Sequence, residues 1–432
     1  MNRTTTIALT GDSFITRRLT PFDEPAFRAL LGLIRGASTA FTNLEVVLHD
    51  YEAPPMNPGG GTHARGAPQL AKDLQWAGFD LVSRANNHAG DFGTEGLRAT
   101  TKHLDAIGLV HAGVGESLEE AREARYLETS AARVALVSAA TTFPEYALAA
   151  DARQGVLGRP GLNPLRTETE ITLTRTVYDE LASVCDRAGI TRPHRGLGLQ
   201  PPFTGEGFHL AGNFVRPGRA PEVAQAFAAD DVAAIRGAVQ EAAAQADLVI
   251  VSLHTHEAGE DATQPPEHLR AFCRQLAEDG ASTVVCHGPH RLRGVEVVGS
   301  CPIFHSLGNF IFQNETVHRL PAESYRTMGL SDDAQVSDLV DARSDGGQKG
   351  FPASPEYWES VVAVPQWDGR ELATISLHPV VLGFGCPRTV RGRPMIADRE
   401  DAERIMAEFV ALSDAYGAVI KDQGDGWRLN VG

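Results

Sequence analysis

The feature that most constrains the fold is an alternation of short apolar runs with amphipathic helical patterns in the first third of the chain. Short apolar runs of this kind are typical of buried strands, and they occur at Thr6–Leu9, Ala40–Val47, Phe79–Ser83 and Arg133–Ala140. Residues 68–78 and 93–107 instead show helical spacing. Strands that alternate with helices indicate a layered α/β fold.

The same rhythm returns in the second half of the chain, after an interruption. The pattern predicts helices at 221–245, 266–279 and 399–416, and strands at 248–253, 282–286, 294–298, 302–305, 358–365 and 372–382. Residues 144–235, with one helix predicted near 168–187, and residues 314–355 are rich in Gly and Pro or irregular. We therefore expect a core over 1–312 with an insertion at about 144–235 over the site. A C-terminal extension, 313–432, would complete the second sheet and add a terminal helix.

Charge and cysteine usage exclude several classes of partner and setting. The chain has 39 Lys and Arg against 55 Asp and Glu, a net charge of −16, which argues against nucleic acid or an anionic membrane as the main partner. Five cysteines without a C-x-x-C pair fit a reducing compartment. No signal peptide and no 18-residue apolar stretch is present, so we expect a cytoplasmic protein. The oligomeric state stays open.

Polar motifs come directly after the predicted strands. They are Gly11-Asp12-Ser13-Phe14, Thr42-Asn43-Leu44-Glu45, Ala85-Asn86-Asn87-His88-Ala89-Gly90-Asp91, Ser252-Leu253-His254-Thr255-His256-Glu257, Cys286-His287-Gly288-Pro289-His290 and Ser306-Leu307-Gly308-Asn309-Phe310. In open α/β sheets ligands bind at the carboxyl ends of strands. A single such motif is most often a cap or turn, but the whole set predicts one shared site.

Taken in order over about residues 5–312, these motifs resemble the CapA branch of the calcineurin-like metallophosphatases. The resemblance rests on the early GD, on NLE, on ANNHA with Asp91 and Gly93, on a His after a central strand, on HGPH and on SLGNF. It implies a four-layer α/β/β/α sandwich with an inserted cap region and with these loops gathered at one edge.

The resemblance also implies a ligand set for metal ions. A two-metal phosphoesterase uses about seven ligands around two cations. Here the family's D-x-H motif reads Asp12-Ser13-Phe14, so one His is lost. The positions that match are Asp12, Glu45, Asn87, His254 and His290. They leave one divalent ion (Mn, Zn or Fe) open as an alternative, whereas we expect no dimetal centre.

Without a metal, the same loops hold carboxylates and imidazoles, which are the groups of general acid–base catalysis. We expect His88, oriented by Asp12 or Asp91, to face His254, His256 or His290 across a cleft. Two opposed proton-transfer groups suit the epimerisation of a carbon centre. Asn86, Asn87 and backbone N–H groups would stabilise the enolate-like charge.

Within the CapA branch, the chain is similar to epimerases of lasso-peptide gene clusters. That resemblance implies a metal-independent and cofactor-independent enzyme that inverts the Cα of a C-terminal Trp in a precursor peptide. The predicted catalytic residues are Asp12, Glu45, Asn87, His88, His254, His256 and His290, and the predicted substrate-binding residues are Asn86, Asp91, His63, Arg65 and His287.

Several alternatives stay open. The chain is alternatively a metal-dependent phosphoester or amide hydrolase, or a non-catalytic protein of polyglutamate capsule assembly. Arg65, Arg159 and Arg166 are candidates to pair with a peptide carboxylate, although each is also expected at the surface. The glycines at 59–61 predict a flexible lid, because no P-loop Lys-Ser/Thr follows them. Cys286 is expected to be a buried, inert thiol.

Overall fold

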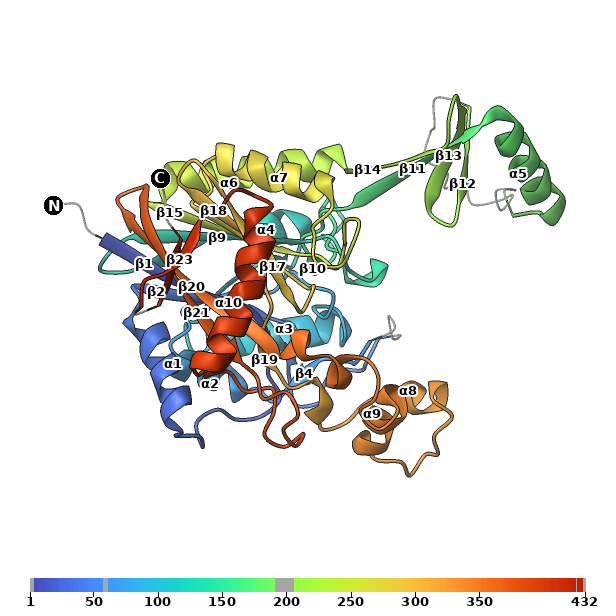
Figure 1. Cartoon of the computed structure of the whole chain (residues 1–432). Helices are drawn as coiled ribbons and strands as arrows, with labels where there is room; N and C mark the ends of the chain where they lie inside the picture. Colours follow the sequence, from blue (N-terminus) through green and yellow to red (C-terminus); the bar gives the residue numbers. More distant parts are fainter. Residues whose placement is uncertain (1–3, 57–60, 191–205, 425, 430–432) are drawn as a thin grey trace. The chain divides into compact units, whose positions relative to one another are not determined.

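The computed structural model describes residues 4–56, 61–190, 206–424 and 426–429. The chain divides into two compact units, which are described separately. The core unit comprises Met1–Pro164 and Ala233–Gly432, and the inserted unit comprises Leu165–Val232. Figure 1 shows the elements of both units in the order of the chain. Gly59 and Gly60 of the predicted lid lie outside the described residues.

The larger sheet of the core unit has ten strands. Their order is β23 (Ile420–Asp422), β24 (Trp427–Leu429), β21 (Glu371–Val381), β20 (Glu359–Asp368), β1 (Thr4–Phe14), β2 (Thr39–Leu44), β5 (Leu81–Ser83) and β6 (Val110–Ala112), with β19 (Asn309–Phe312) beside β1 and β22 (Met395–Ile396) beside β21. The strands β1, β2, β5, β6 and β19 are parallel, whereas β20 runs antiparallel to β1. Chain segments from both ends therefore meet at β1.

The second sheet has six strands. Their order is β17 (Leu292–Val298), β18 (Cys301–Leu307), β16 (Thr283–His287), β15 (Leu248–His254), β9 (Arg133–Ala140) and β8 (Arg125–Glu128). Two short ribbons, β3 (Val47–Leu48) with β4 (Arg65–Gly66) and β7 (Val114–Gly115) with β10 (Gly161–Leu162), lie in the connecting loops. The central strands are buried along their whole length, as expected for strands covered on both faces.

Helices complete the outer layers. The helices of the core unit are α1 (Pro25–Gly36), α2 (Leu70–Ala77), α3 (Gly93–Asp105), α4 (Leu118–Arg122), α6 (Ala229–Gln245), α7 (Glu267–Glu278), α8 (Ala322–Thr327), α9 (Val336–Ser344) and α10 (Arg399–Asp414). In α1, Pro25 occupies the first turn, where its missing N–H costs nothing. Phe27, Leu30, Leu31 and Ile34 recur at helical spacing and turn one buried face to the larger sheet.

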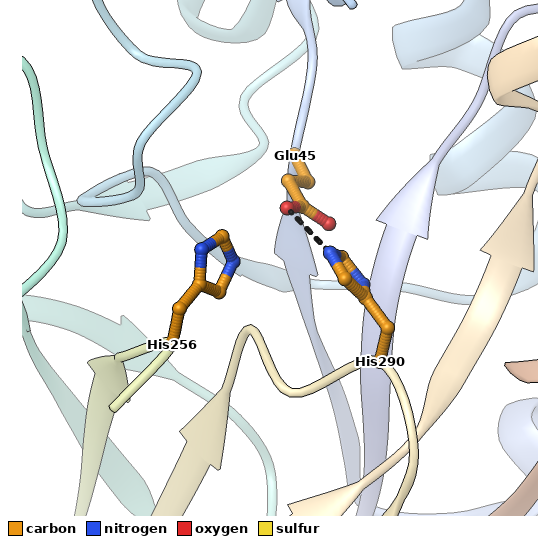
Figure 2. A group of neighbouring side chains, drawn as sticks. All are labelled: Glu45, His256 and His290. Carbon is orange, nitrogen blue, oxygen red and sulfur yellow. Dashed lines mark ion pairs between the residues drawn. The ribbon is translucent and has the colours of Figure 1, made fainter. Parts of the chain in front are cut away.

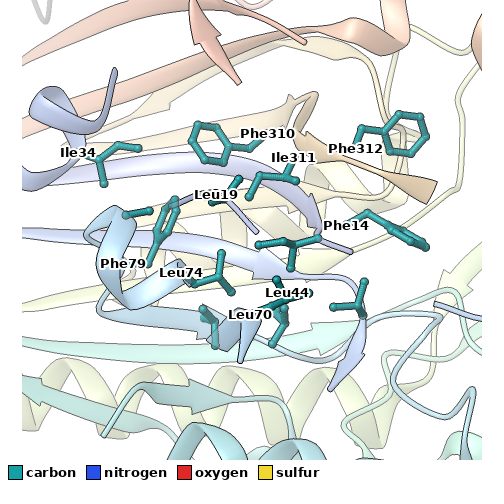
Figure 3. Close-up of a cluster of buried hydrophobic side chains, with 14 of the residues drawn as sticks. Phe14, Leu19, Ile34, Leu44, Leu70, Leu74, Phe79, Phe310, Ile311 and Phe312 are labelled. Atoms are coloured by element: carbon teal, nitrogen blue, oxygen red, sulfur yellow. The ribbon is translucent and has the colours of Figure 1, made fainter. Parts of the chain in front are cut away.

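Two hydrophobic clusters give the layer order. One cluster joins α1 and α2 to the outer face of the larger sheet, and Figure 3 shows Ile34, Leu74 and Phe79 among its side chains. The other cluster lies between the two sheets and includes Leu9, Phe41 and Ile250. On its far side, the six-stranded sheet packs against α7. The structure thus confirms the predicted α/β/β/α sandwich.

The inserted unit is a small α/β module. Its four strands lie in the order β12 (Phe208–Leu210), β13 (Asn213–Gly218), β11 (Thr167–Thr174) and β14 (Glu222–Phe227), and α5 (Arg175–Ala188) contacts β11 and β13. Tyr178 and Cys185 of α5 are buried. The guanidinium of Arg166 holds the fully buried Asp231 at 2.7 Å, which closes the two ends of the unit.

The structure differs from the sequence expectation at three places. The helix predicted at 168–187 begins only at Arg175, because residues 167–174 form β11 and pair with β13 and β14. The helix predicted at 221–245 likewise begins at Ala229, after β14. The irregular stretch 314–355 contains α8 and α9. In the first two cases cross-strand pairing overrides helix-like composition.

The strands of the C-terminal extension join β1 in the ten-stranded sheet, and α10 packs against β17 and β21. Among the described residues, no helix is both long enough and apolar enough to cross a bilayer.

Candidate functional site

The predicted polar motifs meet at one edge of the core unit. In the larger sheet, Asp12 pairs in register with Asn43 on β2 and with Asn309 on β19. In the second sheet, His254 pairs with His287. Since parallel strands end on the same side, their carboxyl ends bring these side chains together.

Two glycines shape the end of β1. The pairing register of β1 shifts at Asp12, as in a β-bulge, and the Asp12 N–H donates to the carbonyl of Gly308 at 3.1 Å. A Cβ on Gly11 would lie 1.8 Å from the Gly308 oxygen, and Gly308 itself has a φ of 75°. Only glycine permits this approach, which directs the Asp12 carboxylate into the site.

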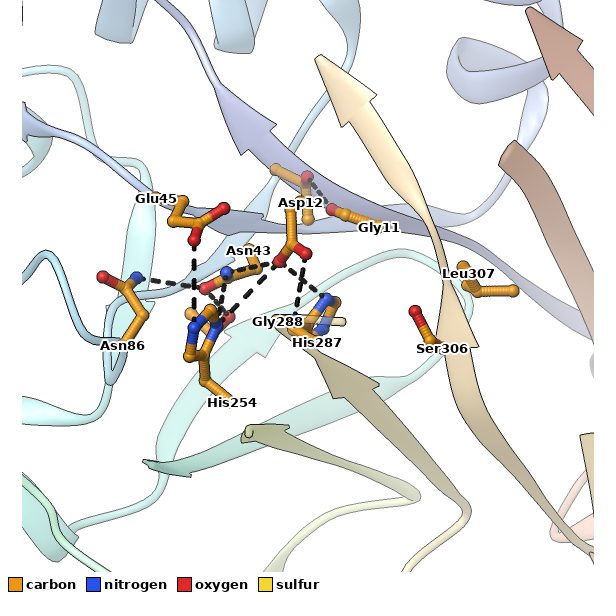
Figure 4. Close-up of polar contacts among 12 residues, drawn as sticks. Gly11, Asp12, Asn43, Glu45, Asn86, His254, His287, Gly288, Ser306 and Leu307 are labelled. Carbon is orange, nitrogen blue, oxygen red and sulfur yellow. Dashed lines mark hydrogen bonds and ion pairs between the residues drawn. The ribbon is translucent and has the colours of Figure 1, made fainter. Parts of the chain in front are cut away.

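A first group, the interior cluster, consists of Asp12, Asn43, His254 and His287, and each of them is at most 1% exposed. Figure 4 shows them around Asp12. Asp12 Oδ1 accepts from Asn43 Nδ2 at 2.8 Å, and Asp12 Oδ2 accepts from the Gly288 N–H at 3.0 Å. His287 Nδ1 lies 3.4 Å from Asp12 Oδ1. The Asp12 carboxylate therefore has donors of its own protein on both oxygens.

A chain of hydrogen bonds fixes the ring of His254. Asn86 Nδ2 donates to the Leu44 carbonyl at 2.9 Å and to Asn43 Oδ1 at 3.2 Å, so the Asn43 oxygen faces Asn86. Asn43 Nδ2 then points to His254 Nδ1 at 3.2 Å, and this ring nitrogen must accept. The proton of neutral His254 consequently sits on Nε2, which faces Glu45 Oε1 at 3.8 Å.

The electrostatics of the interior cluster favour an ionised Asp12 carboxylate beside a neutral His254 ring. Burial alone raises the pKa of Asp12, but the contact with His287 and the charges of the neighbouring imidazoles outweigh it, so the pKa is lowered overall. Burial first, and the charge of His256 second, lower the pKa of His254 well below that of free imidazole. Asp12 thus stays charged and His254 stays neutral at neutral pH.

A second group, the cavity cluster, consists of Glu45, His88, His256 and His290. These side chains line a cavity of about 450 Å³, together with Asn87 and several aromatic rings. An adjoining cavity of about 230 Å³ also contacts His88 and His256. The Oδ1 atom of Asn87 is buried and has no hydrogen-bond partner among the described residues. Neither cavity is lined by a member of the interior cluster.

Glu45 is the centre of the cavity cluster. It is fully buried, and neither carboxyl oxygen has a hydrogen-bond partner in the described part of the chain. Its Oε1 lies 3.6 Å from His290 Nε2 and 4.0 Å from His88 Nε2. Burial, followed by the charges of Asp12 and Asp91, raises the pKa of Glu45 well above its ordinary value. The carboxyl group therefore retains its proton at a pH at which an exposed Glu has lost it.

His88 forms a dyad with Asp91. His88 Nδ1 lies 2.7 Å from Asp91 Oδ2, and the same oxygen accepts from the Ala64 N–H at 2.6 Å. A carboxylate only accepts, so Nδ1 carries the proton of the neutral ring. In this tautomer His88 Nε2 is the acceptor nitrogen, and it lies 4.0 Å from Glu45 Oε1. Of the two carboxylates expected to orient His88, Asp91 is the one in contact.

His290 is held by Asn309. Asn309 Nδ2 donates to the carbonyls of His290 and Tyr357, at 3.1 and 2.9 Å. Asn309 Oδ1 therefore faces His290 Nδ1 at 2.9 Å and accepts a hydrogen bond from it. Since Nδ1 carries the ring proton, His290 Nε2 is an acceptor nitrogen. The backbone of His290 has a φ of 58°, an uncommon conformation for a side-chain-bearing residue that functional sites often retain.

One divalent ion fits the cavity cluster. One carboxylate oxygen of Glu45 and one ring nitrogen each of His256 and His290 lie within 4.8 Å of one another, and Figure 2 shows them pointing toward a common point. The free oxygens of Glu45 and the free Nε2 of His290 are suitable donors, and two imidazoles with one carboxylate are a common set for Zn, Mn or Fe. This set shares Glu45 and His290 with the set predicted from sequence.

A second ion fits poorly. Phe14 stands where the family motif has a His. Both oxygens of Asp12 already accept hydrogen bonds, and the Nε2 atom of His254 carries a proton. The donor set of this structure thus matches one metal ion rather than two.

The predicted substrate-binding residues take different places. Asp91 and His63 line the smaller cavity, and His63 Nε2 contacts the Met56 carbonyl at 2.9 Å. Asn86 uses both amide protons to hold Asn43 and Leu44, so it has no donor left for an enolate. His287 belongs to the interior cluster and lines neither cavity.

The arginines considered as carboxylate partners all have partners within the protein. Arg65 pairs with Asp50 at 2.9 Å and lines neither cavity of the site. Arg159 donates to the Leu148 carbonyl, and Arg166 pairs with Asp231. Cys286 is fully buried, as expected, with its sulfur 3.8 Å from that of Cys273.

Sequence reasoning left Asn43 and Asn309 without a role, although both stand in motifs that it singled out. Their place in these strand-end motifs is the signal that could have found them. Arg291, Arg293, Phe351 and Tyr357, which also line the larger cavity, had no comparable signal.

Comparison with known proteins agrees with this architecture. The family described as "Bacterial capsule synthesis protein PGA_cap" matches residues 6–314. An uncharacterised protein of Sinorhizobium fredii, y4sH, is 34% identical over 429 residues, which cover 96% of this chain and 90% of that protein.

Two curated relatives come from Bacillus. The capsule biosynthesis protein CapA of Bacillus anthracis is 23% identical over 72% of this chain and 60% of its own length. The PGA biosynthesis protein CapA of Bacillus subtilis is 25% identical over 58% of this chain and 47% of its own length. These matches confirm the resemblance to CapA that the strand-end motifs indicated.

Proposed function

The chain belongs to the bacterial capsule synthesis protein family PGA_cap, and from this premise we propose that it is a cytoplasmic acid–base enzyme that inverts the Cα of a residue in a peptide. The peptide we propose is a ribosomal precursor of the lasso type with a C-terminal Trp. The proposed reaction needs no metal or organic cofactor.

The observation that carries the proposal is the arrangement around Glu45. Two imidazoles, His88 and His290, direct their Nε2 atoms at one buried carboxyl group that keeps its proton. Each ring is oriented from behind, His88 by Asp91 and His290 by Asn309. The cavity wall thus offers proton acceptors and a stored proton within about 4 Å of each other.

In the proposed reaction, His88 Nε2 takes the α-proton from one face of the substrate carbon. The Asp91 carboxylate, 2.7 Å behind the ring, stabilises the imidazolium that forms. The electron pair moves into the adjacent carbonyl, and an amide donor such as Asn87 stabilises the resulting oxyanion. A proton supplied by Glu45 through His290 then returns to the opposite face, which inverts the centre. Glu45 then takes up a proton from solvent, and His88 releases its proton to solvent, which restores the starting state.

Incubation in heavy water tests this proposal. The purified protein is mixed with synthetic peptides that end in L-Trp, and the products are hydrolysed and analysed by chiral chromatography with mass spectrometry. We expect D-Trp that carries one deuterium at Cα. D-Trp without deuterium would contradict the mechanism, and no D-Trp with any precursor encoded beside the gene would contradict the reaction.

A second candidate is a metal-dependent phosphoester or amide hydrolase, favoured by the cluster of Glu45, His256 and His290. A divalent ion bound there supplies a Lewis acid and an activated water. In that case His88 and Asp91 serve as the general acid. Stoichiometric Zn, Mn or Fe in the purified protein, together with loss of activity on chelation, would favour the hydrolase over the epimerase. Because the Bacillus relatives are named for capsule and PGA biosynthesis, poly-γ-glutamate belongs among the substrates tried.

A further inference from the structure

The larger cavity contains a cationic group that the proton-transfer account does not use. Arg293, on β17, is 2% exposed and lines the cavity. Its Nε donates to the Ala262 carbonyl at 3.1 Å, but its Nη1 is buried without a hydrogen-bond partner among the described residues. A buried guanidinium that lacks a counter-ion is costly, so such groups are retained where a ligand supplies the charge.

Arg291 extends the same positive patch. It lies two residues before Arg293 and directly precedes β17. Arg291 lines the cavity as well, and its Nε is also buried without a partner in the described part of the chain. Neither arginine forms an ion pair with a described carboxylate, whereas the buried Arg65 and Arg393 do.

The surroundings of Arg293 do not neutralise it. The charge of Asp261 raises the pKa of Arg293, but this carboxylate is exposed and accepts a hydrogen bond from the Thr263 N–H. The charges of Cys286 and Tyr416 also raise the pKa of Arg293, although neither group forms a hydrogen bond with it. Burial lowers the pKa of Arg293 to about 10, so the guanidinium still carries its charge at neutral pH. A positive charge thus remains available at the wall of the cavity in a protein of net charge −16.

We propose that Arg293 and Arg291 form a binding site for an oxyanion of the substrate, and that this anion is a peptide carboxylate. The site depends on the proposed function only for the choice of a peptide. A guanidinium binds a planar carboxylate through two parallel hydrogen bonds, which fixes the orientation of the group as well as its place. The subsite lies beside His256 and His290, so a carboxylate held there would place its own α-carbon near the cavity cluster.

Aromatic rings on the cavity wall fit the remainder of such a ligand. Phe312 and Phe351 pack edge to face at 5.0 Å, and Phe351 and Tyr357 at 4.8 Å. All three rings line the same cavity as the two arginines. Cationic and aromatic walls together suit a carboxylate that carries an apolar side chain.

Binding of small probes tests the site without any assumption about the reaction. Isothermal titration would compare N-acetyl-L-phenylalanine with its neutral amide, which differs only in the charge of the terminal group. We expect the carboxylate to bind about tenfold more tightly, the magnitude of a charge-assisted hydrogen bond. Inorganic phosphate serves as a second anion. Preference for phosphate over the carboxylate would contradict the assignment to a peptide carboxylate and point to a phosphoester.

Three variants sharpen the test. Arg293→Met and Arg291→Gln should each reduce the preference for the carboxylate to twofold or less, and Arg98→Gln, which loses only an exposed pair with Glu116, should not change it. Because Arg293 has no counter-ion, Arg293→Met should not lower the thermal unfolding midpoint of the ligand-free protein. Equal binding of acid and amide by the wild type, or full preference in both cavity variants, would overturn the proposal. Arginine-dependent binding without any deuterium exchange would uphold the anion site and refute the epimerase.

Discussion

The interior cluster and the cavity cluster contain the same residue types from the same strand-end motifs, yet they differ in hydrogen bonding. In the interior cluster, Asp12 and Asn43 have protein partners for their polar atoms, whereas His254 Nε2 and both ring nitrogens of His287 have none among the described residues. In the cavity cluster, Glu45 has none among the described residues, and the Nε2 atoms of His88 and His290 point at it. The comparison indicates that the Asp12 carboxylate is held by the protein, while the Glu45 carboxyl group remains available for chemistry.

The division into two clusters also explains why the family's ligand positions fit one metal ion rather than two. The family's metal positions are split between the two clusters, with Asp12 and His254 in the interior and Glu45 and His290 at the cavity. Each oxygen of Asp12 already accepts a hydrogen bond from the protein, which competes with an ion for this carboxylate. What remains is a set for at most one ion, and the same groups are suited to proton transfer when no ion is bound.

The largest expected effect is on turnover, when histidines of the cavity cluster are substituted. His88→Gln and His290→Gln should each reduce turnover of the Trp-ended peptide about 10²–10⁴-fold, the usual contribution of a general acid or base. The thermal unfolding midpoint should stay within a degree or two of the wild type. Turnover in heavy water, measured alongside thermal scans, checks both. A variant that unfolds but retains its specific activity would place that histidine in the scaffold.

The interior cluster should show the opposite behaviour. Asp12→Ala leaves the donors of Asn43 and Gly288 unsatisfied and should lower the free energy of unfolding by about 3–5 kcal/mol, as when a buried charged group is removed from its partners. Urea denaturation at pH 7 measures this. Unchanged stability together with a large loss of turnover would show that Asp12 acts in the chemistry instead.

A smaller effect is expected at the group that orients His290. Asn309→Ala removes the acceptor for His290 Nδ1 and should reduce turnover about 10–100-fold, as for other orienting partners of a functional histidine. Asn309→Asp restores an acceptor and should recover part of the activity, with the acid limb of the pH–rate profile moved to higher pH. Equal losses in both variants, with no change in the profile, would point to a structural role alone.

The last effect concerns the pH dependence of stability, and its size depends on the pH. A carboxyl group whose pKa is raised on folding stabilises the protein fully only below its unfolded pKa, about 4.3, and destabilises it as the pH rises toward the folded value. Glu45→Gln removes this penalty. The variant should therefore gain stability over the wild type by up to about 1.4 kcal/mol per pH unit above pH 4.3. Denaturation at pH 4, 6 and 8 measures the difference. A gap that stays constant with pH would mean that Glu45 titrates normally.

The sequence predicted the sandwich and the strand-end site because both depend on local patterns. Apolar runs such as Arg133–Ala140 are buried strands at the predicted bounds, and the motifs that follow them lie together. The pattern was wrong at β11 and β14, whose composition resembles that of a helix. These two segments, which are about 50 residues apart in the sequence, pair with each other as strands.

Within the site, the sequence named the reactive residues but not their division into two clusters. Whether Asp12 or Glu45 is satisfied depends on the orientation of amides such as Asn43 and Asn86, which only the assembled structure fixes. Arg293 was not predicted because a single Arg in a strand has no motif. The aromatic wall from Phe351 and Tyr357 lies beyond the residues that the PGA_cap family matches, so family motifs do not reach it.

The central claim is that the cavity cluster moves protons without a metal ion. The most direct test is the deuterium content at Cα of the product that the chelated, metal-free wild-type protein forms from a Trp-ended peptide in heavy water. The account predicts D-Trp with one deuterium at Cα, formed at the same rate as by untreated protein. Loss of the product on chelation, with recovery when Zn, Mn or Fe is added back, would contradict it.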